Sequence, residues 1–325
     1  MKKTYINSFI IDLQLFAETY DASTVGMTTE KPSSMSNEMK SYYNTELLEN
    51  AQPELVYIQF GKPTHIPAGS GRSAEWRRFE RFEKVTTPLV EGVVPKPSAT
   101  TLSVVTADTE EYGDWTPVSD VLDLTAIDNV ILSIMKEHGD NAGRSLDSIV
   151  RDVVYSNSNV YGDGASVITP ALIAQCVAAL KRNNTPTIDG SYHCIIHPSV
   201  SYDLMQDKSW IDVHKYQDAE KIYEGEIGKL YGVRFFETTQ APVTAEKIYY
   251  TPIFGLDAYG VVDVTGGALE TIVKDKSEGG TANPLNQYST VGWKITAFGA
   301  AMLYPERLVN LKVTSSLAAA DTANV

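Results

Sequence analysis

The chain is poor in the residues and motifs on which many enzymes and membrane proteins depend. It has two cysteines and five histidines in 325 residues. No segment carries a Walker A loop, a G-x-S-x-G elbow or the glycine fingerprint of dinucleotide-binding folds. After the N-terminus, no stretch is apolar for long enough to span a bilayer. The sequence therefore predicts neither a cofactor nor a membrane partner.

Both cysteines, Cys176 and Cys194, stand inside apolar runs. Such positions favour two buried free thiols over a disulfide. Free thiols suit a reducing cytoplasm, so a secreted domain stapled by disulfides is not expected.

Positive charge is also scarce. The 27 Lys and Arg residues are outnumbered by 41 Asp and Glu residues, which gives a formal net charge of −14. Such a chain repels phosphate backbones on average, so its composition argues against a protein that coats nucleic acid. Hydrophobic residues make up 43% of the chain, enough for one large core or two moderate ones.

The histidines give only a weak indication of a metal site. His193 and His197, with Cys194 between them and His214 further on, are residue types that bind zinc. On a strand, however, a spacing of four residues spans about 13 Å, which is too far for one ion. An acidic chain supplies carboxylate pairs by chance, and no nucleophile motif selects among them. We therefore expect no metal and no catalytic site, with a cytoplasmic α+β hydrolase as an alternative.

The N-terminus imitates a secretory signal without meeting its requirements. Lys2 and Lys3 precede an apolar run, but Asp12 and Gln14 interrupt that run. Small and polar residues follow, which predicts a flexible arm. Helical spacing then predicts a short helix that ends near Pro53.

Residues 61–118 predict a long two-stranded ribbon. The first strand, Ala74–Val85, places Trp76 and Phe82 on one face and Phe79 on the other, so neither face is cleanly apolar. Prolines and a glycine break the chain before it returns as a second strand. Antiparallel pairing would place arginines opposite acids and set the register, at ~0.2–1 kcal/mol per pair. The residues of this expected interface are Arg72, Trp76, Arg77, Arg78, Arg81, Asp108, Glu110, Glu111 and Asp114.

A ribbon with no single core to join suits a loop that lies over a neighbouring subunit. One alternative is an ordinary hairpin packed on its own domain. Another is a basic aromatic strip that stacks on nucleic acid, which the nearby Glu80 and Glu83 disfavour.

After Val118 the pattern changes to a helix. Apolar residues at helical spacing predict one long helix over Asp128–Tyr155, on the order of 40 Å in length. Gly139 and Gly143 inside it each cost about 1 kcal/mol relative to Ala, which predicts a bend or a close packing contact there.

Residues 166–264 have the pattern of a compact α/β unit. Thr169 followed by a proline predicts a helix start, and the strand Tyr192–Ile196 leads into a helix that begins at Pro198. A helix end and a tight turn are predicted before the strand Val233–Glu237. The glycines that indicate them are Gly225, Gly228 and Gly232.

The chain closes with two strand-like runs. These runs, Tyr288–Tyr304 and Arg307–Thr314, are separated by a breaker at Pro305. The second run alternates apolar and polar residues. The pattern predicts that the two runs form a twisted antiparallel pair.

Several segments together resemble one protein family. They are the closing stretch from Gly279 to Thr314, the N-terminal string IIDLQLFAET, the lead-in EEYGDWTPVSDVLDL, the helical RSLDSIVRDV and the strand-His-Pro-helix before the glycine-rich turn. They are similar to segments of tailed-phage major capsid proteins of the Hong Kong phage-type fold, over most of the chain. The N-terminal string resembles the leader of phage and prophage structural proteins, especially those of Gram-positive hosts.

The resemblance implies an α+β fold with five regions. They are an N-terminal arm and short helix (1–60), the E-loop, which is an extended β-hairpin (61–118), the P domain with its spine helix (119–165), an inserted α/β A domain (166–264), and strands returning to the P-domain sheet with a C-terminal tail (265–325).

The resemblance further implies a shell protein without enzymatic activity. Copies would self-assemble as pentamers and hexamers into an icosahedral capsid that encloses double-stranded phage DNA without sequence-specific binding. Scaffolding, portal and, in some shells, decoration proteins would be its partners. The implied location is the virion capsid, after assembly in the bacterial host cytoplasm. An encapsulin nanocompartment shell of the same fold, which encloses an enzyme cargo, is the nearest alternative.

Overall fold

The computed structural model of this chain describes most residues from 44 to 325. The residues outside the description are 1–43, 46, 52–53, 68, 80–81, 83, 90, 93, 95–96, 101, 126–129, 208–228, 265–268 and 277–282. Several sequence predictions fall outside the described residues: the N-terminal arm, Pro53, Arg81, His214, Gly225, Gly228 and Gly279.

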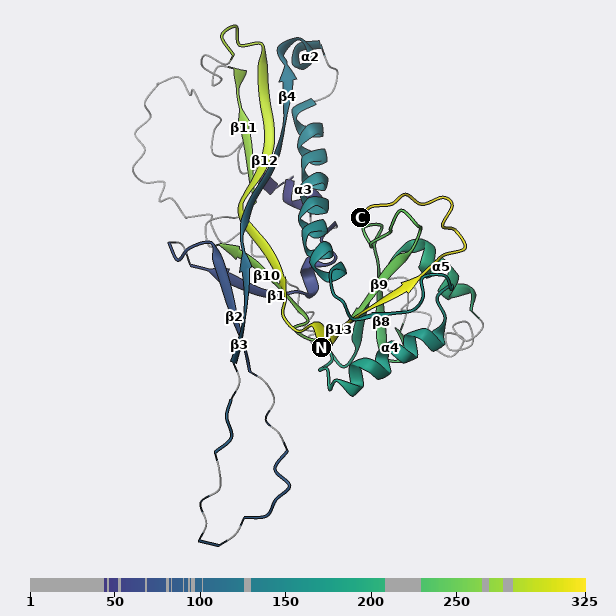
Figure 1. Cartoon of the computed structure of the whole chain (residues 1–325). Coiled ribbons are helices and arrows are strands. Elements are labelled where there is room, and N and C mark those ends of the chain that lie inside the picture. Colours follow the sequence, from purple (N-terminus) through teal and green to yellow (C-terminus); the bar gives the residue numbers. More distant parts are fainter. Residues whose placement is uncertain are drawn as a thin grey trace, which may run out of the picture.

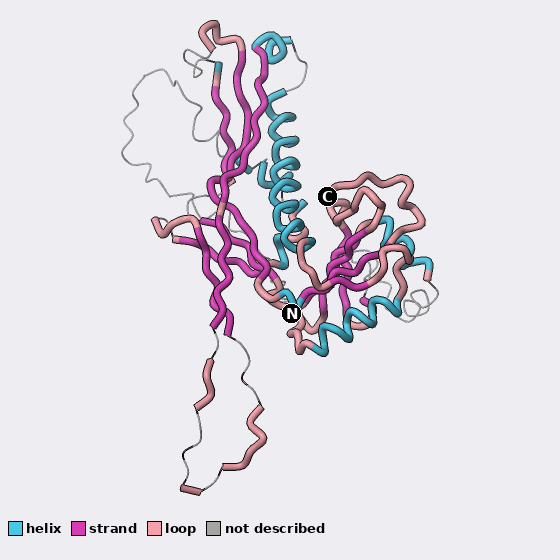
Figure 2. The backbone as a smooth tube through the Cα atoms, viewed as in Figure 1, coloured by secondary structure: helices cyan, strands magenta, loops and turns pink. Residues whose placement is uncertain are grey.

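Two large sheets, each with its own helices, make up the body, and a thin ribbon extends away from them (Figures 1 and 2). The ribbon pairs β2 (Ser73–Phe79) with β3 (Leu102–Asp108). The long helix α3 (Val130–Tyr155) runs along the first sheet, and the second sheet lies to the side of its lower end in Figure 1. Mixed sheets with separate helices confirm the predicted α+β class.

Strand β12 forms the centre of the first sheet. One of its edges pairs antiparallel with β4, and the other pairs first with β11 and then with β10, to which β1 adds in parallel. A β-bulge between Ile295 and Phe298 marks the change of partner. The five strands are β1 (Lys62–Ile66), β4 (Glu110–Ser119), β10 (Tyr259–Val264), β11 (Glu270–Lys274) and β12 (Tyr288–Met302).

Helix α3 confirms the long helix predicted from apolar spacing, with its described start at Val130 rather than Asp128. A short helix, α2 (Asp120–Thr125), precedes it. The buried stripe of α3, which includes Met135, Ala142 and Val150, packs against β12. In the described part of the chain, no helix has the length and apolar character needed to cross a membrane.

The second sheet has the strand order β5-β13-β9-β6-β8-β7. Its strands are β5 (Val160–Tyr161), β6 (Tyr192–Ile196), β7 (Lys229–Leu230), β8 (Val233–Glu237), β9 (Tyr249–Phe254) and β13 (Leu308–Val313). Helices α4 (Pro170–Arg182) and α5 (Pro198–Gln206) contribute to the same core. The strands predicted at β6 and β8 are confirmed.

Local signals in this unit act as predicted. The hydroxyl of Thr169 accepts a hydrogen bond from Leu172 N, and the following proline begins α4. Gly232 has a φ of 82° in the two-residue turn between β7 and β8, a conformation that favours glycine. Cys176 and Cys194 are free and buried, as expected.

The prediction that the last two strands pair with each other is wrong. After β12, the short helix η5 (Pro305–Arg307) leads the chain into the second sheet, where β13 lies antiparallel to β9 and parallel to β5. The polar residue that made β13 look half-exposed, Asn310, is buried. Its amide donates to Val154 O at 3.0 Å and to Tyr155 O at 3.3 Å, so it satisfies carbonyls at the end of α3. Burial on both faces therefore places β13 inside the second sheet.

The two glycines of α3 mark a close helix contact. A Cβ at Gly139 would lie 2.6 Å from Leu47 O, and one at Gly143 would lie 2.6 Å from Ala51 O. Both carbonyls belong to the helical residues 47–51, which therefore cross α3 at backbone distance. This confirms the close packing contact predicted at these positions.

One turn further along α3, the buried Asp147 continues the same contact. One of its carboxylate oxygens accepts from Tyr57 N at 2.7 Å and from Ile58 N at 3.2 Å, next to the short helix η2 (Ile58–Phe60). Burial raises the pKa of Asp147 to about 7, although these backbone N–H groups and Arg151 act in the opposite direction. A stripe with a spacing of four residues thus holds the described residues between 47 and 58 on α3.

Replacement of Gly143 by Ala should destabilise the subunit. The new methyl group meets a backbone oxygen rather than a flexible side chain, so we expect a loss of about 1–3 kcal/mol in unfolding free energy, despite the higher helix propensity of Ala. Urea denaturation of the isolated chain measures this loss. The control is Glu137→Ala on the exposed face of α3, which should change stability by less than about 0.5 kcal/mol. Equal stability of Gly143→Ala and the control would contradict the close contact.

The subunit should lose stability as pH rises toward neutrality. Because the folded pKa of Asp147 lies above its unfolded value of 3.8, its contribution is complete below about pH 4 and is lost as pH rises through about 7. Between pH 5 and pH 8, the wild type should lose about 2–3 kcal/mol more than Asp147→Asn, which cannot ionise. Denaturation of both proteins across this range is the measurement. Parallel pH profiles for the two proteins would contradict the raised pKa.

Candidate assembly surfaces

The ribbon is attached to the body by one of its two faces. Trp76 on this face packs where Gly260 leaves room, since a Cβ there would lie 2.7 Å from the indole ring. The indole N–H also donates to Thr64 Oγ1 at 2.9 Å. A small apolar cluster completes the attachment and consists of Ile66, Ala74, Ala107 and Val262.

Among the described residues, the charge pairs predicted across the ribbon do not form. In the observed register, Arg77 lies opposite Val104 and Arg78 lies opposite a serine. The second strand changes partner at Thr109, because β3 pairs with β2 whereas β4 continues beside β12. Arg72 fixes this change: its carbonyl accepts from Thr109 N at 2.8 Å, and its guanidinium donates to Thr109 O at 3.0 Å. The acids that follow Thr109 are therefore in a different sheet.

The charged residues of the predicted interface have individual partners instead. Arg81 lies outside the described residues. The observed contacts are Asp108 with Ser73 Oγ, Glu110 with Tyr112 OH at 3.2 Å, Glu111 with Lys294, Asp114 with Trp115 N at 2.8 Å and Arg78 with Glu306 at 2.8 Å.

The free face of the ribbon is apolar at its far end. Phe79 lies directly opposite Leu102, and Val104 shares their face. Their exposed fractions are 65%, 47% and 50%, so the described part of the subunit leaves them largely uncovered. Further exposed apolar residues follow in the loop beyond the strands: Phe82, Val85, Leu89 and Val94. An apolar surface of this kind on an extended element is a candidate interaction site.

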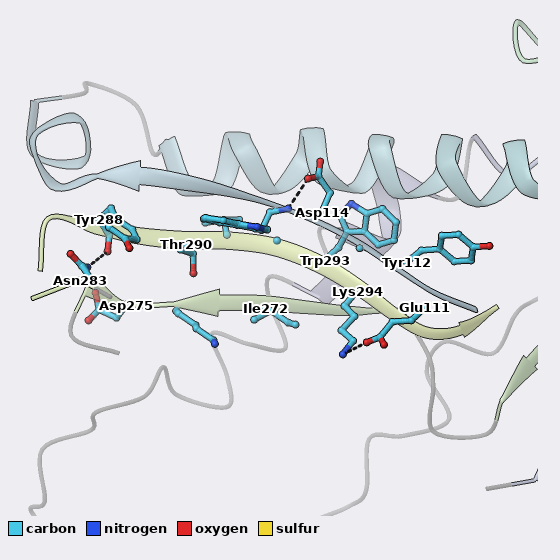
Figure 3. A pocket seen from close by; sticks show the side chains of 15 residues that line it. Glu111, Tyr112, Asp114, Ile272, Asp275, Asn283, Tyr288, Thr290, Trp293 and Lys294 are labelled. Carbon is cyan, nitrogen blue, oxygen red and sulfur yellow. Dashed lines mark hydrogen bonds and ion pairs between the residues drawn. The ribbon is translucent and has the colours of Figure 1, made fainter. Parts of the chain in front are cut away.

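A groove of about 590 Å³ lies on the first sheet, among β4, β11 and β12 (Figure 3). Figure 3 shows Asp114 and Trp293 pointing toward α3, whereas Lys294, Glu111 and Ile272 point away from it. The indole N–H of Trp293 donates to a residue of α3, which identifies the helix-covered face of the sheet. The groove therefore opens on the face that α3 leaves free.

The floor of the groove is a row of three residues from neighbouring strands. Ile272 and Trp115 lie opposite Gly292 from either side. The glycine is needed there because a Cβ would lie 2.8 Å from the Cβ of Trp115. Trp115 is 62% exposed. The free face of an antiparallel sheet usually presents polar residues to water, so this apolar row indicates a surface that a partner covers.

Charged side chains border this floor. Lys294 forms an ion pair with Glu111, and their hydrogen bond lowers the pKa of Glu111 and raises the pKa of Lys294. Lys274 and Asp275 line the groove as well. An apolar floor with charges of both signs at its border suits a protein segment better than a nucleic acid.

The histidines considered as metal ligands point to different surroundings. His193 lies among Phe60, Phe236 and Phe254, and this burial lowers its pKa to about 4. His197 instead caps α5 by accepting from Ser199 N at 3.2 Å. Among the described residues, no group of three or more His, Cys, Asp or Glu side chains is placed to hold a metal.

One cluster contains the residue types of a hydrolase triad without its geometry. Ser199 Oγ donates to Asp321 at 2.5 Å, and Nδ1 of His197 accepts from the backbone N–H of Ser199. The hydroxyl is therefore bonded to the carboxylate and not to the imidazole that would have to remove its proton. These contacts, with Tyr249 OH donating to Asp321, fasten the C-terminal tail to α5 and β9.

Sequence reasoning missed the groove. One sequence signal for the groove was available: Gly113 and Gly292 lie inside strands, where a glycine often marks a place that another segment approaches closely. Trp115, two residues after Gly113, adds a large aromatic side chain beside this position. Only the register between β4 and β12 shows that Trp115 and Gly292 meet on one face.

A family model described as "Phage capsid protein" matches residues 103–311 of this chain. No curated protein sequence matches it. The matched region begins in β3, includes β4, β11 and β12, which line the groove, and ends in β13.

Solved structures of low sequence identity share the fold. The capsid of cyanophage P-SCSP1u is similar with a TM-score of 0.62 and 15% identity, covering 81% of this chain and 89% of that chain. The capsid of Ralstonia phage GP4 has a TM-score of 0.60 and 11% identity, covering 91% and 96%. A virus-like particle from Pyrococcus furiosus has a TM-score of 0.52 and 14% identity, covering 84% and 99%. The expected Hong Kong phage-type capsid fold is thereby confirmed.

Proposed function

Because this chain belongs to the phage capsid protein family and functions as a major capsid protein, we propose that the ribbon of one subunit covers the sheet groove of the next during assembly. The observation that carries this proposal is a pair of unpartnered surfaces. The apolar ribbon end, centred on Phe79, and the apolar groove floor, centred on Trp115, are both exposed in the subunit.

The arrangement of these surfaces favours contact between copies. The ribbon and the groove lie toward opposite ends of the long first sheet (Figure 1). A subunit therefore offers a protruding surface at one end and a receiving surface at the other. Such head-to-tail contacts are heterologous, and they close into rings when the rotation between copies allows it. Rings of five and six copies on a closed icosahedral shell are the assembly we propose.

The family distinguishes this function from the alternatives. The model of the phage capsid protein family covers most of the chain. This match favours a phage capsid over an encapsulin shell, and a structural role over an enzymatic one. We infer that the shell encloses double-stranded phage DNA without sequence-specific binding. The net charge of −14 supports this, because a lining that bound DNA tightly would obstruct packing.

Finer parts of the proposal rest on the resemblance of the sequence to tailed-phage major capsid proteins and to the leader of phage structural proteins. We infer a phage or prophage of a Gram-positive host, assembly in the host cytoplasm, and scaffolding, portal and, where used, decoration proteins as partners. We also propose that the E-loop, P-domain and A-domain regions correspond to the ribbon, the first sheet with α3, and the second sheet. β1, β4 and β10 then count with the first sheet, and β5 and β13 with the second, so the predicted regions 61–118, 119–165, 166–264 and 265–325 each change.

Substitution of either exposed centre should block assembly without unfolding the subunit. Phe79→Ser and Trp115→Ser remove apolar side chains that the subunit itself leaves exposed, so unfolding free energies should change by less than about 0.5 kcal/mol. If each residue is a hot spot worth about 2 kcal/mol, the subunit concentration needed for assembly should rise about tenfold or more. Sedimentation and electron microscopy measure this threshold.

The control is Glu75→Gln, on the same exposed ribbon face but nearer the body. It should assemble at the wild-type concentration. Normal assembly of both Phe79→Ser and Trp115→Ser would contradict the proposed contact between ribbon and groove. Unfolding of either variant would instead show that the substituted residue belongs to the subunit's own core.

A crosslinking experiment tests the contact directly. Leu102→Cys and Thr290→Cys place one thiol on the free ribbon face and one in the groove, while the natural cysteines are buried. With a bis-maleimide, the double variant should form chains linked between subunits in assembled particles, and each single variant should not form such ladders. Links that appear only within one chain would show that the ribbon folds back on its own subunit.

A further inference from the structure

The two large sheets are joined by a short junction that is held from several sides. The chain leaves β12, passes Tyr304 and the short helix η5, and enters β13. Asn183 at the end of α4 donates to Glu306 O at 3.0 Å, and Asn157 after α3 donates to Pro305 O at 3.1 Å. Arg307 donates to Leu256 O at 3.1 Å. The junction therefore has a defined position relative to the helices of both sheets.

The ribbon contacts this junction through Arg78. Arg78, the next-to-last residue of β2, forms an ion pair with Glu306 at 2.8 Å. Its guanidinium also lies 5.0 Å from the centre of the Tyr304 ring, over which Arg307 lies at 3.7 Å. The ribbon thus meets an aromatic ring and a carboxylate that belong to the connection between the sheets.

We propose that Arg78, Glu306 and Tyr304 form a clamp that sets the angle of the ribbon relative to the junction between the two sheets. This inference rests on the proposed function, because the clamp positions the ribbon for a neighbouring groove. Its residues are positioning residues and need not touch the neighbouring subunit.

The position of Arg78 along the ribbon supports this role. Trp76 and the apolar cluster around Ala74 attach the ribbon at its base. Arg78 lies about 7 Å further along β2 than Trp76, at about 3.3 Å per residue. A second attachment at this distance restricts rotation about the first. Movement of the ribbon then requires the junction to move or the clamp to open.

The clamp differs from an ordinary surface ion pair in its expected consequences. A surface pair contributes a little to global stability and nothing to the direction of an exposed element. A clamp changes the opening of the ribbon while the two sheets keep their stability. Arg77 provides a matched control, because it has the same charge and adjoins Arg78, but faces away from the body with an exposed side chain.

The test uses Arg78→Gln, Glu306→Gln, the double variant and Arg77→Gln in the full chain. In unassembled subunits, hydrogen exchange of the β2 and β3 amides should be about two- to fivefold faster in both single clamp variants. The double variant should exchange no faster than the faster single variant, because both substitutions remove the same contact. Arg77→Gln should exchange at the wild-type rate, and all variants should keep the wild-type melting temperature.

Assembly provides the second readout. In electron micrographs, the clamp variants should give a wider distribution of particle diameters than the wild type, or open forms. Exchange rates of Arg78→Gln equal to those of Arg77→Gln would overturn the clamp, as would additive effects in the double variant. Because exchange is measured in free subunits, this result does not depend on the ribbon occupying a groove. Faster exchange with normal particles would overturn the dependence of assembly on the ribbon angle.

Discussion

The pairing of β12 along both of its edges is the constraint on which the rest of the structure depends. This strand of 15 residues bonds to β4 on one side and to β11 and β10 on the other. Since α3 covers only one face of it, the same strand provides a buried core on one side and the groove on the other. Its end leads through the junction at Pro305 into the second sheet. Core, groove and junction are thus consequences of one strand.

The exposed surfaces are better explained by the assembly than by the subunit. Phe79 on the ribbon and Trp115 in the groove each expose most of an aromatic side chain, which an isolated globular protein seldom does over a continuous patch. Gly292 makes room for Trp115 at a cost in strand propensity, so the free sheet face is built around this residue. A capsid subunit gains from such surfaces because each contact is repeated at every copy.

The polar contacts act mainly on the position of segments. Asp147 and the two glycines of α3 hold the described residues between 47 and 58 close to this helix, while Asp321 fastens the C-terminal tail to α5. Arg78 does the same for the ribbon. A buried carboxyl with a pKa of about 7 makes the first of these attachments sensitive to pH near neutrality. Each attachment joins a peripheral segment to a rigid helix, strand or turn.

Sequence by itself determined the local elements and the family. Capping at Thr169, the strand pattern of β6 and the apolar stripe of α3 are local signals that the structure confirms, because they depend on residues a few positions apart. The partners of the strands were decided by tertiary structure. β13 pairs with β9 and not with β12 as expected, because Asn310 is buried against the carbonyls at the end of α3. Arg77 and Arg78 do not face their expected acids, because the chain changes sheets at Thr109. The groove forms only when β4 and β12 are in register. Alternation shows that a strand has two faces, but which strand lies beside it depends on contacts between residues far apart in the chain.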